Sequence, residues 1–320
     1  MPSIISILSW LVALYQAWSI GANDETVAPV VSGRALTVNQ AVIIGSIFGA
    51  LGAILLGSGV QETIGKGLFM KSLTEGHVLI ILLSSSIWLT IISYFGLSVS
   101  TTHSTIGALL GFGILTAGLG DVNWGTIISI IGGWLIAMPI GYFACYYGTK
   151  AIVKLKAKSK TPEAFEGVCT KLLIVSTFIL EFSRWGNDVG NASGFMLGFH
   201  APWVTRLICA LAMSFGLLVL GRIVVGNVGV NLVALTPGSA LISQIVSTPL
   251  IFAFAFVGVP LSGTHVQIAA ILGAGNALNA RIDTKLARNF GIAWILSFIA
   301  PALLAALLTV IGSATGILAS

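Results

Sequence analysis

Two polar motifs interrupt the apolar sequence of this chain, and each occurs twice. The first places Asn23 and Asp24 in GANDETVAP and returns as Asn187 and Asp188 in GNDVGNASG. Glycine and asparagine tolerate non-helical backbone, so a helix can break there and leave carbonyl oxygens free. Those oxygens, with Asp and Asn side chains, are hard ligands that suit a small cation. A helix cap is the alternative for one copy, but the repeated pair favours a cation site.

The second motif is a group of hydroxyls followed by a histidine. Its two copies are Ser100, Thr101, Thr102 and His103, and then Ser262, Gly263, Thr264 and His265. Hydroxyls both donate and accept hydrogen bonds without bringing charge. At the start of a helix they would join free backbone N–H groups, and together these groups can bind an oxyanion without Lys or Arg. The alternative is that the hydroxyls only hold neighbouring helices together.

The two histidines, His103 and His265, follow the hydroxyls at matching places. Histidine titrates near neutral pH, which makes a proton relay one interpretation. The other is structural: each ring would bond a neighbouring carbonyl and hold its loop.

The elements that position these motifs must be membrane helices. Of the 320 residues, 56% are hydrophobic and 8% are charged, and the mean hydropathy is +1.02. A soluble domain carries about 25% charged residues. The three cysteines, Cys145, Cys169 and Cys209, are too scattered for a disulfide framework or a metal site. We therefore expect an all-α, multi-pass protein of the cell membrane, with residues 4–20 retained as a membrane segment.

The apolar runs, some of them short, divide into five and five, and we expect about five to six helical segments in each repeat. The runs cover residues 4–20, 41–60, 78–95, 104–119 and 125–147, and then 168–183, 203–221, 240–259, 264–279 and 287–312. Gly, Ser, Thr or Pro break several runs, and short, interrupted segments at corresponding places in two halves indicate a transporter binding site.

The landmarks of the two halves keep their order and spacing. Asn23 and Ser100 lie 77 positions apart, and Asn187 and Ser262 lie 75 apart. Ser100 precedes Trp134 by 34 positions, as Ser262 precedes Trp294 by 32. This spacing indicates a duplication, with residues 1–147 as the first repeat and 168–320 as the second.

Residues 148–167 hold five lysines and separate the repeats. Basic residues near membrane ends favour the cytoplasm, so we expect a solvated cytoplasmic linker; contact with anionic lipid is the alternative. An odd number of crossings per half would invert the second repeat, and five crossings before the linker would place the N-terminus outside. The broken helices or re-entrant hairpins of both repeats would then meet at the membrane midplane.

Together, the acidic and the donor-rich breaks predict a symporter that takes a small tetrahedral anion with a cation. The cation offsets the cost of bringing a charged anion into low dielectric. A passive anion channel would leave Asp24 and Asp188 unexplained, and an intramembrane enzyme would not need two matched copies of its residues. We therefore expect a transporter and not an enzyme.

The motifs GANDETVAPVVSGRALT, SVSTTHSTIG, WGNDVGNASG and GVPLSGTHVQ resemble the signatures of the inorganic phosphate transporter (PiT) family. The resemblance spans both halves and implies inverted repeats, a central phosphate site, alternating access and cotransport with Na+ or H+. It implies phosphate contacts for the residues of the hydroxyl motifs, Ser100, Thr101, Thr102, Ser262, Gly263 and Thr264, with Asp24 and Asp188. It implies cation binding, with Na+ favoured, for Asn23, Asp24, Asn187, Asp188 and Asn191.

The chain departs from the family pattern at three places. A second Asn follows the Asp by three positions in the second half, as Asn191, but the first half has Val27 there, so one of two cation sites is expected to be altered. Gly49 stands where the family often has Glu. Arg34 stands where a small residue is expected. It could pair with Glu25 or Asp24, or lie at a helix end with its charged group extended into water. The alternative is contact with the anion.

The remaining charged residue of interest is Glu181, in an apolar run with Arg184. A local ion pair is one interpretation, and a gating or coupling role is the other. The expected substrate is phosphate rather than sulfate, because phosphate keeps a proton that a nearby carboxylate can accept. No cofactor besides the coupling ion and no nucleic acid partner is expected; the lipid bilayer surrounds the protein, and a homodimer is left open.

Overall fold

The computed structural model describes residues 4–116 and 119–315, and within these ranges the regular structure is helical apart from two isolated β-bridges. The long helices are α1 (Ile4–Ala22), α3 (Val38–Leu56), α5 (Glu75–Tyr94), α6 (Thr101–Thr116), α7 (Trp124–Lys158), α8 (Pro162–Asp188), α10 (Pro202–Gly216), α12 (Pro237–Phe256), α13 (Gly263–Ala277) and α14 (Thr284–Thr315). Each predicted apolar run falls mainly in one of them. The short helices are α2 (Ala28–Ser32), α4 (Ser58–Glu62), α9 (Gly190–Ser193) and α11 (Arg222–Gly226).

Seven helical segments of the described residues are long and apolar enough to cross a membrane. Counted among them is Pro202–Leu232, in which α10 continues through π-helical turns and α11. The predicted class, an all-α membrane protein, is confirmed.

The two repeats agree in detail. An antiparallel bridge joins Phe69 to Val122 in the first repeat, and another joins Val233 to Ile282 in the second. Phe69 in the first repeat corresponds to Val233 in the second, 164 positions later. Val122 corresponds to Ile282, 160 positions later. Duplication therefore extends from the motifs to the backbone pairing.

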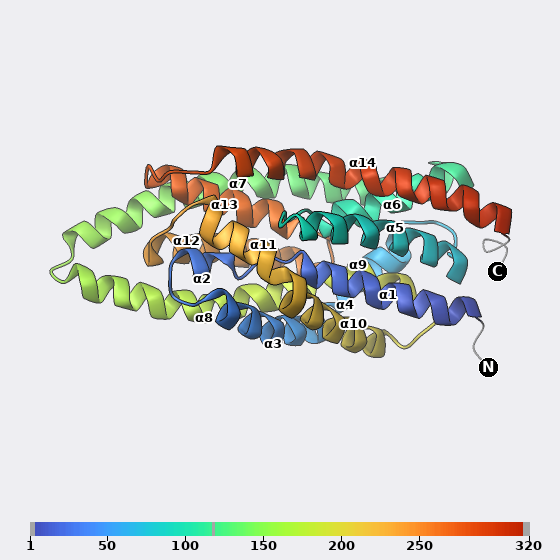
Figure 1. The fold of residues 1–320 in the computed structure, drawn as a ribbon, viewed down its shortest axis with the longest axis horizontal. Helices are drawn as coiled ribbons and strands as arrows, with labels where there is room; N and C mark the ends of the chain where they lie inside the picture. Colours follow the sequence, from blue (N-terminus) through green and yellow to red (C-terminus); the bar gives the residue numbers. More distant parts are fainter. Residues whose placement is uncertain (1–3, 117–118, 316–320) are drawn as a thin grey trace.

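Each bridge shows where a helical hairpin starts and ends. Phe69 precedes α5 and Val122 follows α6, so the α5–α6 hairpin leaves and returns to the same end of the molecule. The α12–α13 hairpin does the same at the opposite end, where α14 begins (Figure 1). The tips of the hairpins touch, because Thr264 Oγ1 lies 3.3 Å from the Val99 carbonyl oxygen. Both hairpins are therefore re-entrant, as predicted, although the five apolar runs of each half then make fewer than the five full crossings that we expected before the linker.

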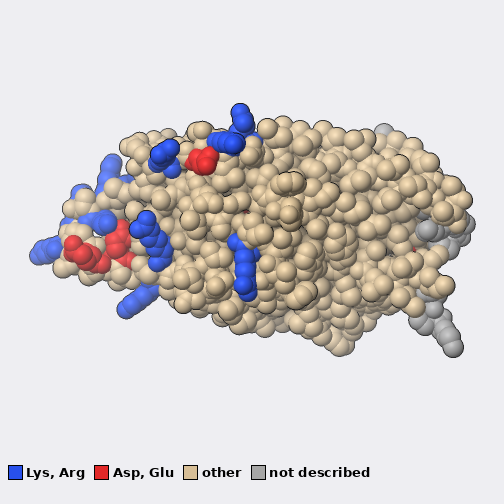
Figure 2. Space-filling model, viewed as in Figure 1, with Lys and Arg blue, Asp and Glu red and all other residues tan. Residues whose placement is uncertain are grey.

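The number of membrane crossings in the first repeat is still odd. The first repeat crosses with α1–α2, α3 and α7, and the hairpin adds no crossing. The turn between α7 and α8 consequently lies at one end of the molecule and both termini lie at the other (Figure 1). Charged side chains gather at the α7–α8 end in the face shown in Figure 2, whereas the opposite end shows almost none.

The basic segment between the repeats is helical rather than a loop. Its first part extends α7 to Lys158, and its last part begins α8 at Pro162, which leaves a turn of three residues between them. Lysine, alanine and glutamate are good helix formers, and Pro162 suits a first helical position. An ion pair of 2.8 Å between Lys156 and Glu166 joins the two arms.

The repeats interlock through the second arms of the hairpins. Helix α6 packs on α14, and its counterpart α13 packs on α7. A Cβ at Gly111 would lie 2.1 Å from the Ala302 carbonyl oxygen, and one at Gly273 would lie 2.3 Å from the Tyr142 carbonyl oxygen. These two glycines occupy matched positions and allow the backbones to approach closely, as small residues do between membrane helices.

Candidate functional site

The two hydroxyl motifs lie at helix starts, as their composition led us to expect. Helix α6 begins at Thr101, and helix α13 begins at Gly263. The hydroxyl of Ser100 accepts the His103 N–H at 3.1 Å and so caps α6, whereas the buried hydroxyl of Ser262 has no hydrogen-bond partner among the described residues. The side chains of both motifs are buried except that of His103, which is partly buried. Two helix N-termini therefore converge on the centre of the molecule.

The asparagines of the acidic motif hold the segments that precede these helices. Asn23 accepts the Val99 N–H at 2.9 Å and donates to the Leu97 carbonyl at 3.1 Å. Asn187 accepts the Leu261 N–H at 3.1 Å and donates to the Val259 carbonyl at 3.2 Å. Each asparagine side chain thus bonds the backbone carbonyl just before one residue and the backbone N–H just after it. These two groups have no regular helical partner, and the asparagine takes the place of that partner. Their predicted role as cation ligands stays a prediction, but the structure gives both amides a positioning role.

Tryptophans hold the same segments from the other repeat. Trp134 donates to the Pro260 carbonyl at 3.2 Å, and Trp294 donates to the Ser98 carbonyl at 3.2 Å. The rings of His103 and His265 lie between these indoles, with centroids 4.6 Å apart. Within residues 4–116 and 119–315, neither histidine Nε2 finds a hydrogen-bond partner. The pseudo-twofold axis relating the repeats therefore passes between the two imidazoles.

The two aspartates have different surroundings. Asp24 Oδ1 accepts the backbone N–H and the hydroxyl of Thr26 at 3.0 and 2.5 Å, and its Oδ2 accepts the Trp185 indole at 2.6 Å. Asp188 Oδ2 accepts from Arg184 Nε at 2.6 Å, while no described residue donates to its Oδ1 with hydrogen-bond geometry, although the Thr101 hydroxyl is a neighbour of this carboxylate. Asp24 is thus satisfied by the protein, and Asp188 has an oxygen to spare.

Asn191 lies one turn beyond Asp188 and also has a free oxygen. Its amide donates to Thr102 Oγ1 and to the Asp188 carbonyl, both at 3.3 Å, and its Oδ1 has no hydrogen-bond partner in the part of the chain that the structure describes. Both residues are buried. Two hard oxygens, spaced by three residues, are left open beside the start of α6.

Arg184 joins both motifs, which the sequence reasoning did not foresee. Its Nε donates to Asp188, one terminal nitrogen donates to Glu25 Oε1 at 3.2 Å, and the other donates to Thr264 Oγ1 at 2.7 Å. Glu25 Oε2 accepts the hydroxyl of Ser98. A basic residue in an apolar run, four positions before Asp188 on one helix, was the signal for this contact.

Two expected ion pairs do not form. Arg34 is exposed, at a positive φ of 57° just after α2, and makes no ion pair among the described residues. The expected partners, Asp24 and Glu25, bond inside the core instead. Glu181 is fully buried but does not bond Arg184, and neither of its carboxylate oxygens has a hydrogen-bond donor within the described part of the chain. Arg184 instead reaches the carboxylate one turn further along α8.

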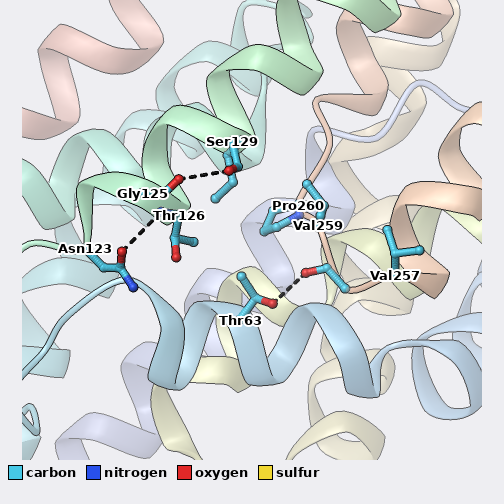
Figure 3. Close-up of a pocket in the computed structure, with 10 residues that line it drawn as sticks. Thr63, Asn123, Gly125, Thr126, Ser129, Val257, Val259 and Pro260 are labelled. Atoms are coloured by element: carbon cyan, nitrogen blue, oxygen red, sulfur yellow. Dashed lines mark hydrogen bonds between the residues drawn. The ribbon is translucent and has the colours of Figure 1, made fainter.

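A cavity of about 450 Å³ leads from the surface toward the tip of the α12–α13 hairpin (Figure 3). Its walls are the α4 region, the start of α7 and the segment from Val257 to Pro260, and its polar side chains are those of Thr63, Asn123, Thr126 and Ser129. The hydroxyl of Thr63 donates to the Gly258 carbonyl at 2.6 Å. Because Pro260 stands two residues before Ser262, this cavity approaches one of the two helix starts.

A second cavity, of about 520 Å³, is related to the first by the repeat. It is lined by Asn227, Val230, Asn231, Asp283, Lys285, Leu286 and Asn289. Asn227 matches Thr63, and Asp283 matches Asn123, at the repeat displacements of 164 and 160 positions. Asn227 also repeats the contact of Thr63, because it donates to the Gly96 carbonyl at 2.9 Å. Gly96 and Gly258 are themselves matched, both with positive φ.

Inverted repeats, re-entrant hairpins and a buried polar centre between matched cavities define a membrane transporter. The model of the phosphate transporter family matches residues 20–305. The chain therefore belongs to the phosphate transporter family, and the resemblance of its motifs is confirmed.

Known relatives agree over nearly the full length. A protein of Thermococcus kodakarensis that is described as a phosphate permease is 27% identical, and the match covers 94% of this chain and 96% of that protein. A protein described as a low-affinity inorganic phosphate transporter of Rhizobium meliloti is 26% identical, covering 96% and 95%. A solved structure entitled the sodium-dependent phosphate transporter superposes with a TM-score of 0.86 at 25% identity, covering 97% of this chain and 99% of that one.

Proposed function

We propose that this protein is a symporter of inorganic phosphate, driven by a cation gradient and working by alternating access around its central site. The observation that carries the proposal is the meeting of two helix N-termini, α6 and α13, beside buried carboxylates. Helix N-termini bind oxyanions through free N–H groups, and carboxylates bind the cation that accompanies the anion. The family and the sodium-dependent relative support phosphate and Na+ as the pair.

The phosphate contacts that we propose are the hydroxyls and N–H groups at the two helix starts. They belong to Ser100, Thr101 and Thr102 on one side, and to Ser262, Gly263 and Thr264 on the other. The carboxylates favour phosphate over sulfate, because only phosphate still carries a proton to donate to them at neutral pH. Asp24 and Asp188 remain candidates for that contact.

We place the coupling cation at the free oxygens of Asp188 and Asn191. The matched place in the first repeat offers no equivalent pair, because Val27 replaces the asparagine and Asp24 is bonded to Thr26 and Trp185. One Na+ site of the family pattern is therefore kept in the second repeat. A proton is the alternative coupling ion.

The matched cavities support alternating access. Each lies at the base of one re-entrant hairpin, α5–α6 or α12–α13, and each is lined by a side chain that donates to a glycine carbonyl at the tip of the other hairpin, Thr63 to Gly258 or Asn227 to Gly96. Only the cavity at Thr63 includes residues of a hairpin tip, Val259 and Pro260, in its wall. We propose that this cavity leads to the anion site in the present conformation and that the other one opens in its place during transport.

Transport in proteoliposomes tests the proposal. Uptake of labelled phosphate is measured with an inward Na+ gradient alone, with a pH gradient alone, and with neither. We expect stimulation by Na+ and weak competition by excess sulfate. Uptake that ignores both gradients would indicate a passive channel, and strong competition by sulfate would favour a sulfate permease. Absence of phosphate uptake under every gradient would refute the proposed function.

Thiol labelling tests the alternation. Cysteines replace Ser129 in one cavity and Asn289 in the matched one, and an impermeant thiol reagent is applied from each side. Phosphate with Na+ should change the two labelling rates in opposite directions. The parent chain, whose three cysteines are buried, sets the background. Rates that rise or fall together would contradict alternating access.

A further inference from the structure

Arg184 is a buried cation that has no counterpart in the first repeat. Its side chain is 2% exposed, and the matched position in the first repeat is Ile20. We propose that Arg184 binds the transported oxyanion directly and couples it to the cation, by exchanging a carboxylate partner for the substrate. This inference rests on the proposed function.

The position of the guanidinium argues for contact with the anion. One terminal nitrogen donates to Thr264 Oγ1 at 2.7 Å, and a Cβ on Gly263 would lie 2.5 Å from the other. The guanidinium therefore lies against the first turn of α13, where the N–H groups of the proposed anion site begin. A bound phosphate at that helix start would be within reach of its donors, and a guanidinium matches two oxyanion oxygens at once.

The balance of buried charge argues that the anion needs this residue. Within the described residues, the buried charged side chains are those of Asp24, Glu25, Glu181, Asp188 and Arg184. Four buried carboxylates thus accompany one buried cation, and two of them, Glu25 and Asp188, are ion-paired with it. A phosphate carrying one or two negative charges would be repelled by such a site unless a positive group stood beside it. Arginine stays charged in proteins, which makes Arg184 the permanent positive group of this centre.

In the present structure Arg184 is held by carboxylates. Its Nε bonds Asp188 Oδ2 at 2.6 Å, and a terminal nitrogen bonds Glu25 at 3.2 Å. Asp188 also carries the free Oδ1 that we assign to the cation. A cation bound there competes with Arg184 for the same carboxylate, weakens its ion pair and leaves its donors for the oxyanion.

The shared carboxylate makes the two ligands cooperate. Because linkage is reciprocal, a cation that frees Arg184 raises phosphate affinity, and phosphate that draws Arg184 away raises cation affinity by the same factor. A purely structural crosslink would hold α8 to the hairpins and would give no such coupling. The two roles therefore differ in their effect on affinities, not only in their effect on stability.

The test compares Arg184→Lys and Arg184→Gln with the wild type in full-length protein. Phosphate KM and the Na+ concentration for half-maximal uptake are measured in proteoliposomes. Thermal unfolding in detergent, titrated with NaCl without phosphate and with choline chloride as the salt control, reports Na+ binding independently of transport. Arg222→Gln, which removes an exposed arginine on α11, is the matched control.

We expect Arg184→Lys to raise phosphate KM about tenfold or more, because an ammonium cannot match two oxyanion oxygens at once as a guanidinium does. Arg184→Gln should abolish saturable uptake and should lower the NaCl concentration that stabilises the protein, because Asp188 is freed. Arg222→Gln should match the wild type. Wild-type phosphate KM and Na+ response in both Arg184 variants would overturn the inference.

A third variant decides the question if Arg184→Gln does not fold. Glu25→Gln removes one carboxylate that holds the guanidinium, so phosphate KM at low Na+ should fall at least threefold. An unchanged or higher KM would contradict the exchange. Failure here is distinguishable from failure of the proposed function, because in the latter case the wild-type protein itself takes up no phosphate.

Discussion

The indole of Trp185 donates to Asp24 Oδ2 across the repeat interface, at 2.6 Å. Arg184, the preceding residue, bonds Asp188 within its own repeat. Two consecutive residues of α8 therefore hold the two motif carboxylates, one each. The contact of Trp185 requires space in α3, where a Cβ at Gly49 would lie 2.3 Å from the indole ring. The glycine that departs from the family pattern is thus explained by the tryptophan that fills its place.

The first prediction concerns that fit. Gly49→Ala should destabilise the protein by about 1–3 kcal/mol, because overpacking a dense core forces the ring to move. The measurement is thermal unfolding in detergent. Gly132→Ala is the control, since a Cβ at Gly132 meets no atom within 4 Å. Equal melting temperatures for the two variants would show that Trp185 is not held as described.

The second prediction concerns the helix starts. Thr102→Val and Thr264→Val keep the shape of a buried side chain and remove its hydroxyl. Each should weaken phosphate binding by about 1–3 kcal/mol for the hydrogen bond lost, seen as a higher phosphate KM. Thr309→Val is the control, because that buried hydroxyl bonds only the Ala305 carbonyl of its own helix. A double variant with wild-type KM would refute the assignment of the anion site.

The third prediction concerns the asymmetry between the aspartates. Asp188→Asn should raise the Na+ concentration for half-maximal uptake, because it removes the charge from the proposed cation site. Asp24→Asn should act mainly on stability, since its carboxylate is occupied by Thr26 and Trp185. Uptake against Na+ concentration, with melting temperatures for both variants, separates the two effects. Equal losses of Na+ affinity would mean that both repeats bind the cation.

Much of this fold could be predicted from the apolar runs and from the repeated motifs. The runs predicted the ten long helices. The spacing of Asn23, Ser100 and Trp134, which the second half repeats, indicated the duplication. The count of crossings failed because the first helix of the hairpin, α5, is long and apolar enough to cross a membrane. Its re-entrant path depends on the bridge between Phe69 and Val122, which has no signal in hydropathy.

The site was harder to predict because its contacts cross between repeats. The composition of the hydroxyl motifs was enough to predict that they lie at helix starts. The contacts of Ser98 with Glu25, of Arg184 with Thr264 and of Trp185 with Asp24 were missed, because each joins residues far apart in sequence. Arg184 had several acidic neighbours on α8, and only packing decides that it faces Asp188 and not Glu181. Partner choice in a buried network is set by the fold and not by proximity in sequence.

The last prediction separates two roles for the motif asparagines. Asn23→Asp and Asn187→Asp preserve the shape and the acceptor oxygen, but a carboxylate cannot donate to the carbonyl of Leu97 or Val259. If the asparagines are cation ligands, the added charge should preserve or tighten Na+ binding. If they position the hairpin tips, as their contacts indicate, both variants should lose phosphate affinity and melt at lower temperature, since a buried charge would face a carbonyl. Because the two contacts are matched, the losses should be of similar size. Phosphate KM and NaCl-dependent unfolding distinguish the outcomes, and a gain of Na+ affinity without loss of phosphate affinity would return these residues to the cation site.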